Sequence, residues 1–128
     1  MSKPEAIIWD LDNTLVDVTT ILKYADPRHP ESLGSPDYDM YHLHSIECPP
    51  RADVLAEYRA KLAEGYVPLV VTARQAQYAK STSKWMMKHG IYPREIHFRK
   101  DGDIRPDMEI KAEILDDLLD HYNIVGAW

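Results

Sequence analysis

Ile7-Ile8-Trp9-Asp10-Leu11-Asp12-Asn13-Thr14-Leu15 places two carboxylates two residues apart, directly after an apolar run. The run over residues 6–9 is short and continuously apolar, which predicts a buried β-strand. Because side-chain alternation breaks where a strand ends and the backbone turns, Asp10 and Asp12 can face one point. One carboxylate could attack phosphorus while the other transfers a proton, and together they could hold Mg²⁺. Asp-x-Asp followed by Asn also forms ordinary Asx turns, so the motif alone leaves both interpretations open.

Helices and strands are predicted to alternate along the rest of the chain. Apolar residues recur at helical spacing over residues 52–64, 75–89 and 108–121, while short apolar runs at 67–71, 96–98 and 124–125 predict further strands. This order predicts one doubly wound α/β domain over residues 1–128, with a parallel sheet. Ligands bind at the carboxyl ends of such strands, where Asp10, Thr72 and Arg99 are all expected.

A proline-rich segment interrupts this alternation. Residues 16–50 hold five of the nine prolines, and we expect them to form an irregular, cap-like excursion over the strand ends. Within it, His29, His42 and His44 include a His-x-His pair, but zinc is the lesser alternative because no Cys or His elsewhere has matching spacing. Cys48 is predicted to be a packing residue, since no helix start or base accompanies it.

Charge and cysteine content limit the class of protein. The net charge of −6 argues against a protein that coats nucleic acid, but residues 74–111 carry nine Lys/Arg and five Asp/Glu, which leaves −10 on the rest. This local excess suits a phosphate-bearing partner, although Lys80, Lys84 and Lys88 also fit a solvated helix face. Cys48 is the sole cysteine and cannot form an intramolecular disulfide. No apolar run could span a membrane, so we expect a cytoplasmic protein.

Three motifs resemble known ones. The first resembles the signature of the haloacid dehalogenase (HAD) phosphohydrolase superfamily, Asp-x-Asp-x-Thr after an apolar strand, with Asn13 where many members have Gly. Val70-Val71-Thr72-Ala73-Arg74 resembles the second HAD motif in the version of phage-type polynucleotide kinase-phosphatases. The segment from Phe98 to Lys111 resembles the part of their 3′-phosphatase domain that carries the HAD lysine. The resemblance covers roughly residues 6–128 and implies a HAD-like Rossmannoid three-layer sandwich with a minimal cap.

The resemblance implies a role for each motif residue. Asp10 would be the nucleophile that forms an aspartyl-phosphate, and Asp12 the general acid and base. Lys111 would neutralise the phosphoryl group and the nucleophile, and Asp107, one helical turn earlier, would orient the lysine. Mg²⁺ would take a side-chain oxygen of Asp10 and the backbone carbonyl of Asp12. The groups expected at the phosphoryl oxygens are Thr14, Thr72, the N–H groups near Ala73 where a helix opens, Arg74 and Arg105.

The resemblance implies removal of a 3′-phosphate from a nucleic-acid end. A 5′(3′)-nucleotidase-like phosphatase for small molecules, and a non-catalytic HAD-like binding module or fragment, are the alternatives. The last rests on the absence of the fourth HAD motif: in HAD phosphatases a pair of acids follows the strand that residues 123–125 begin, and the sequence stops at Trp128 before such a pair. We therefore expect a C-terminally truncated sheet that self-associates through residues 124–128 or leaves them mobile. No Gly-x-x-x-x-Gly-Lys-Ser/Thr occurs in the sequence, so ATP is not a predicted substrate.

Overall fold

A four-stranded parallel sheet forms the centre of the computed structural model, which describes residues 2–32 and 34–128. Its strands are β1 (Glu5–Trp9), β2 (Val67–Gln75), β3 (Glu95–Arg99) and β4 (Asn123–Ala127). They lie in the order β3-β2-β1-β4, and all three pairings are parallel. The prediction of a parallel α/β sheet is confirmed, and the fourth strand lies beside the first.

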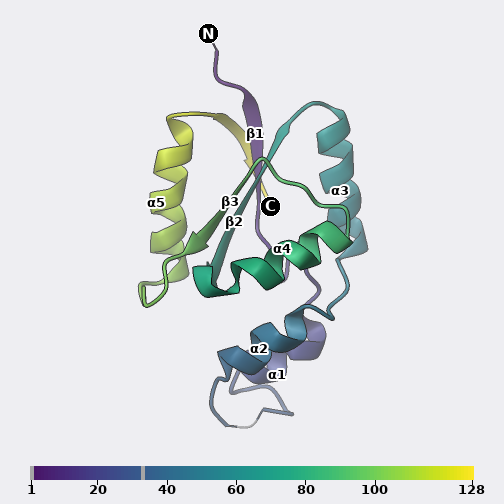
Figure 1. The fold of residues 1–128 in the computed structure, drawn as a ribbon, viewed down its shortest axis with the longest axis vertical. Helices are drawn as coiled ribbons and strands as arrows, with labels where there is room; N and C mark the ends of the chain where they lie inside the picture. Colours follow the sequence, from purple (N-terminus) through teal and green to yellow (C-terminus); the bar gives the residue numbers. More distant parts are fainter. Residues whose placement is uncertain (1, 33) are drawn as a thin grey trace.

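Helices cover both faces of the sheet (Figure 1). α3 (Ala52–Ala63) and α4 (Ala79–Lys88) pack on one face, and α5 (Asp107–Leu119) packs on the other. Side chains alternate along β1 and so supply two cores. Ile7 and Trp9 belong to the first core, on the side of α3 and α4, whereas Ala6 belongs to the second, on the side of α5. The expected three-layer sandwich is confirmed.

The three long helices begin and end close to their predicted limits. The segment predicted as one helix over 75–89 instead starts with a 3₁₀ turn, η2 (Ala76–Tyr78), before α4. Leu62 of α3 and Leu119 of α5 belong to the apolar spacing that predicted these helices, but both are exposed. They lie in the last turn of their helices, where the backbone passes the edge of the core. Gly65, with φ of +96°, ends the turn after α3, a conformation that favours glycine.

The excursion over residues 16–50 is more regular than predicted. It contains η1 (Thr19–Ile21), α1 (Leu22–Ala25) and α2 (Tyr38–Ser45), and it lies beyond the carboxyl ends of the strands (Figure 1). The Asp37 carboxylate caps α2 by accepting a hydrogen bond from the Met40 N–H. Ile21, Tyr41 and Cys48 are buried in the first core, which fixes the excursion to the sheet. Cys48 is a packing residue, as predicted.

β4 is an edge strand, and its end supports the turn after β1. The Trp128 N–H donates to the Ile8 carbonyl at 2.9 Å, and the Trp128 main-chain oxygen accepts from the Asp10 N–H at 3.1 Å. The Trp128 ring also stacks on Trp9, with centroids 5.4 Å apart. Self-association through this edge stays a prediction. In the part of the chain that the structure describes, no helix has both the length and the apolar character needed to cross a bilayer.

Candidate active site

The turn from Asp10 to Thr14 directs the two carboxylates to different partners. The buried Leu11 carbonyl accepts from the Thr14 N–H at 3.0 Å and from the Val16 N–H at 2.8 Å, which closes the turn. Asn13 adopts a φ of +60°, a left-handed conformation that Asn tolerates better than most residues other than Gly. This conformation accounts for Asn at a position where many HAD sequences have Gly. Both carboxylates remain partly exposed.

Asp10 is paired with Lys111, which lies 101 residues later in the sequence. The Lys111 ammonium donates to Asp10 Oδ2 at 2.6 Å. Asp10 Oδ1 accepts from the Leu11 N–H at 2.8 Å, so both oxygens have fixed positions. The two residues also line a hollow of about 280 Å³ together with Met108, Leu115 and Trp128. The structure therefore brings together two residues that the sequence predicted to meet, although their roles stay a prediction.

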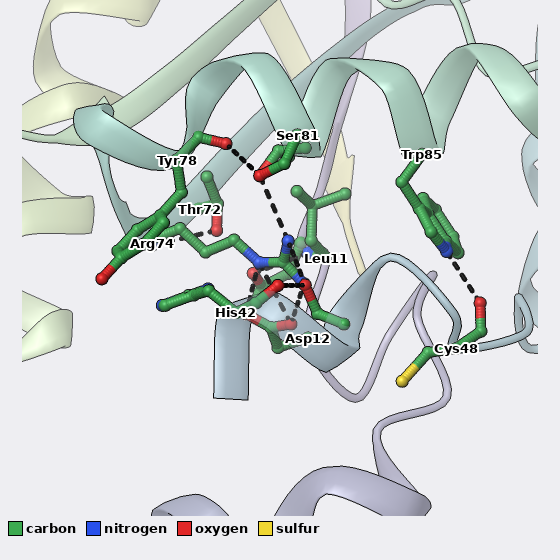
Figure 2. A network of polar contacts seen from close by, with 12 residues as sticks. Leu11, Asp12, His42, Cys48, Thr72, Arg74, Tyr78, Ser81 and Trp85 are labelled. Atoms are coloured by element: carbon green, nitrogen blue, oxygen red, sulfur yellow. Dashed lines mark hydrogen bonds and ion pairs between the residues drawn. The ribbon is translucent and has the colours of Figure 1, made fainter. Parts of the chain in front are cut away.

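Asp12 is held by a buried arginine (Figure 2). Arg74 Nη2 and Nε donate to the Asp12 carboxylate at 2.5 and 3.0 Å, and the Arg74 side chain is only 3% exposed. The remaining Nη1 donates to Thr82 Oγ1 at 3.1 Å and to Ser45 Oγ at 3.5 Å. Burial works against the charged guanidinium, but the hydrogen bonds and charge of Asp12 outweigh it and raise the pKa of Arg74. Such a pair fixes a carboxylate in one orientation.

The prediction that Thr72, Ala73 and Arg74 open a helix is wrong. β2 continues to Gln75, so all three residues are in the strand. Thr72 is buried, and its hydroxyl accepts from the Arg74 N–H at 3.1 Å instead of capping a helix. Val67–Val71 is the apolar part of a longer strand, whose polar end is stabilised by pairing with β3 as far as Gln75 and Arg99. No helix N-terminus presents N–H groups at Ala73.

Asp107 does not contact Lys111 in the manner predicted. Its carboxylate accepts instead from Arg99 Nη2. The same guanidinium donates to the carbonyls of Ala73 at 3.1 Å, Asp103 at 2.8 Å and Arg105 at 2.6 Å. Arg99 therefore ties the end of β2 to the loop before α5 and to the first turn of α5. Sequence reasoning placed Arg99 at the strand end but missed this clamp, because its partners are mostly backbone carbonyls.

Arg105 is also engaged by acids. It donates to Asp103 Oδ2 at 2.8 Å and to Glu113 Oε2 at 2.6 Å. The hydrogen bonds from Arg105 lower the pKa of Asp103 to about 2. Arg105 nevertheless lines a cavity of about 600 Å³ beside Asp12, which we call the Asp12 cavity. The remaining lining comes from Ala25, Tyr38, Tyr41, His42, Ala73, Arg74, Gln75, Tyr78, Arg99, Asp103, Ile104, Pro106 and Asp107.

Two buried residues of α2, Tyr41 and His42, lie beside the Asp12–Arg74 pair. The sequence did not predict this position for either of them. Burial, with the Asp12 carboxylate nearby, raises the pKa of Tyr41 above its ordinary value. Burial and the positive charge of Arg74 lower the pKa of His42 to about 4. The His42 ring stacks on Tyr78 at a centroid distance of 3.9 Å, whereas His44 stacks on Tyr24, so the His-x-His pair faces two different neighbours.

The depressed pKa of His42 predicts a loss of stability in acid. The unfolded chain binds a proton near pH 6.5, but the folded chain does so only near pH 4. The contribution of neutral His42 to the free energy of unfolding is therefore fully present above pH 6.5. It is lost as the pH drops towards 4, by at most about 3 kcal/mol. We expect His42→Phe, which keeps a stacked ring, to flatten this part of the pH profile of the unfolding free energy. Urea unfolding between pH 4 and 7.5 measures it, and an unchanged slope would contradict the assignment.

The donor set suits Mg²⁺ only in part. Among residues 2–32 and 34–128, no group of three or more His, Cys, Asp or Glu side chains gathers as a metal site. Mg²⁺, however, is commonly bound by one or two carboxylates with waters and substrate phosphate completing the octahedron. The Asp10 carboxylate and the Asp12 backbone carbonyl are hard oxygen donors of this kind. Asp103 and Asp107 are held by Arg105 and Arg99 and are not directed to Asp10.

The sequence matches a known family, described as the polynucleotide kinase PNKP phosphatase domain, over residues 4–128. No match is found among curated proteins. A solved Pnkp1/Rnl/Hen1 RNA repair complex contains a chain with a TM-score of 0.76 and 23% identity, matched over 99% of this chain and 36% of that one. A chain of a second solved Pnkp1/Rnl/Hen1 complex has a TM-score of 0.78 and 23% identity, matched over 99% of this chain and 39% of that one.

A further similar structure is a class C acid phosphatase from Bacillus anthracis with tungstate bound. Its TM-score is 0.68 and its identity 16%, over 99% of this chain and 52% of that chain. At these identities the similarity establishes the fold. The chain spans between 36% and 52% of the length of these three solved chains.

Proposed function

The chain belongs to the family of polynucleotide kinase PNKP phosphatase domains, and from this premise we propose that it removes 3′-phosphates from nucleic-acid ends. The reaction would be a Mg²⁺-dependent hydrolysis through an aspartyl-phosphate. The observation that carries the proposal is the 2.6 Å contact between Lys111 Nζ and Asp10 Oδ2 at the carboxyl edge of the parallel sheet. The Asp10 carboxylate and the Lys111 ammonium are in contact there, and both side chains are partly exposed to solvent.

Asp10 is the proposed nucleophile. Its carboxylate attacks phosphorus, the bond from phosphorus to the 3′ oxygen breaks, and an acyl phosphate forms on Asp10. Lys111 holds the carboxylate before attack and lies close enough to offset the charge on the transferred group. When bound, Mg²⁺ would add positive charge at the same oxygens, held by the Asp10 carboxylate and the Asp12 carbonyl.

Asp12 is the proposed acid and base. In its protonated form it gives a proton to the departing 3′ oxygen, and as a carboxylate it then takes a proton from the water that hydrolyses the acyl phosphate. Arg74 keeps Asp12 in one orientation through two hydrogen bonds. Arg74 is therefore a positioning residue in this proposal, and not a direct phosphate ligand as the motif implied.

Thr14 and Thr72 have weaker support as phosphate ligands. Thr14 lies in the turn of the two carboxylates and is partly exposed, so its hydroxyl is available. Thr72 is buried, and its oxygen accepts from the Arg74 N–H, although the hydroxyl proton is left to donate. We keep both as proposed ligands, with Thr14 the more accessible.

Substrate preference tests the proposal. We expect kcat/KM for a 3′-phosphorylated oligonucleotide to exceed that for a sugar phosphate by on the order of 10-fold or more, with the 3′-mononucleotide between them, because contacts beyond the phosphoryl group add binding. Phosphate release is measured with Mg²⁺ and with excess chelator, which should abolish turnover. Equal values for the three substrates would favour the small-molecule nucleotidase alternative. No release from any of them would favour the non-catalytic module.

A further inference from the structure

Aromatic side chains form one side of the Asp12 cavity. Tyr38, Tyr41 and His42 come from α2, and Tyr78 comes from η2 after β2. We call these four residues the aromatic wall. Figure 2 shows His42 and Tyr78 next to Asp12 and Arg74, so the wall begins at the proposed acid and base. A substrate group that extends past Asp12 into this cavity would meet aromatic rings.

Tyr41, His42 and Tyr78 form a continuous set of ring contacts in the wall. His42 stacks on Tyr78 with an angle of 24° between the rings, and Tyr41 meets His42 edge-on at 5.2 Å. The Tyr78 hydroxyl donates to Asp39 Oδ1 at 2.8 Å, which fixes its ring from the other end. His42 is neutral near pH 7 because its pKa lies near 4, and its Nδ1 is buried without a partner in the described chain. His42 thus presents a ring and not a cation for phosphate.

Two large apolar side chains at this cavity are left in solvent. Tyr38 is 58% exposed, and Ile104, in the loop before α5, is 94% exposed. Tyr41, buried in the first core, already joins α2 to the sheet, so holding the excursion in place does not require Tyr38 or Ile104. Flat or apolar surfaces of this kind at a cavity mouth favour a ligand with its own apolar face.

The charges around the Asp12 cavity favour stacking of a base on its aromatic rings over binding of a phosphate by its arginines. Each of its three arginines is paired with an acid: Arg74 with Asp12, Arg99 with Asp107, and Arg105 with Asp103. Lys80, Lys84 and Lys88 are exposed on α4 and do not line the cavity. The surplus of basic residues noted in the sequence therefore does not create a strongly cationic cavity. Proteins hold the bases of single-stranded ends by aromatic stacking, which tolerates any base.

We infer that the aromatic wall, with Tyr38 as its exposed member and Ile104 at the cavity mouth, stacks the terminal nucleobase of the substrate. This inference rests on the proposed function and adds a specificity: the site takes base-bearing phosphomonoesters and discriminates against the same sugar phosphate without a base. A paired base at a duplex end must unstack to reach the wall, so an unpaired end is the better substrate.

Binding of two matched ligands tests the inference. Titration calorimetry of the Asp10→Asn variant compares a nucleoside 3′-monophosphate with ribose 3-phosphate, which lacks only the base. We expect the nucleotide to bind about 5- to 150-fold more tightly, the range typical of one stacked base. Tyr38→Ala and Ile104→Ala should each reduce this ratio, and together they should bring it near one. Tyr92→Ala is the matched control, since Tyr92 is 66% exposed and lies outside the cavity lining.

Equal affinity for the two ligands, or binding of neither, overturns the inference, as does an unchanged ratio in the Tyr38→Ala/Ile104→Ala variant. Repeating the titration with the unmodified chain in chelator guards against an effect of the Asp10 substitution. Phosphate release by the unmodified chain with Mg²⁺ separates the two proposals. Release from both ligands at equal kcat/KM, with the 3′-phosphorylated oligonucleotide still the better substrate, would leave the proposed function standing and reject the aromatic wall. Absence of release from either ligand, with base-dependent binding retained, would reject the hydrolase and keep the stacking site.

Discussion

Asp10→Asn is expected to reduce Mg²⁺-dependent phosphate release by on the order of 10⁴-fold or more, while the free energy of unfolding changes by less than about 1 kcal/mol. An amide cannot form the acyl phosphate, so the first covalent step is lost. The fold should persist because the amide oxygen still accepts from the Leu11 N–H, and the lost Lys111 contact is partly exposed. Release assays with a 3′-phosphorylated oligonucleotide and urea unfolding measure the two quantities.

The control for this substitution is Asp116→Asn. Asp116 is an exposed residue in the middle of α5, so it tests the same chemical change outside the site. We expect it to keep full activity and stability. Near-normal turnover in Asp10→Asn would show that Asp10 is not the nucleophile. A large loss of stability would instead show that the Asp10–Lys111 contact is structural.

The sequence predicted the parts of the fold that depend on local pattern. Apolar runs and helical spacing are local signals, and the strand at Ile7 and the helix around Ile110 follow from them directly. The pairing of Asp10 with Lys111 was expected from the resemblance to the HAD motifs. Its physical basis is that residues at the carboxyl ends of parallel strands, and at the helix starts beside them, meet at one edge.

The sequence-based predictions were wrong about the partners of two arginines and about the residue at which β2 ends. Arg74 was expected to face phosphate and instead pairs with Asp12, and Arg99 takes Asp107 away from Lys111. A guanidinium can donate five hydrogen bonds at the end of a long side chain, so its partner is decided by tertiary packing. β2 extends through Thr72 because its backbone pairs with neighbouring strands, and single-sequence propensity does not report pairing.

The pairing of Asp12 with Arg74 gives a prediction in which two carboxylates, separated only by Leu11, behave differently. Asp12→Asn should lower kcat on the order of 10²- to 10⁴-fold, as for loss of a positioned acid and base. Unlike Asp10→Asn, it should also lower the free energy of unfolding by about 3 kcal/mol, because the nearly buried Arg74 guanidinium loses its counter-charge. Arg74→Met should lower stability by a similar amount and kcat by less than Asp12→Asn, since Asp12 would remain but lose its orientation.

The double variant Asp12→Asn/Arg74→Met separates the structural part of the pair from the chemical part. Removing both charges leaves no buried ion uncompensated. The loss of unfolding free energy in the double variant should therefore be smaller than the sum of the two single losses by at least about 1 kcal/mol. Its kcat should stay as low as that of Asp12→Asn, because stability returns without an acid or base. Urea unfolding and phosphate release are measured on all four proteins. Strictly additive stability losses would show that Arg74 does not depend on Asp12 for its charge. Recovery of kcat in the double variant would show that Asp12 transfers no proton and that its pairing with Arg74 is purely structural.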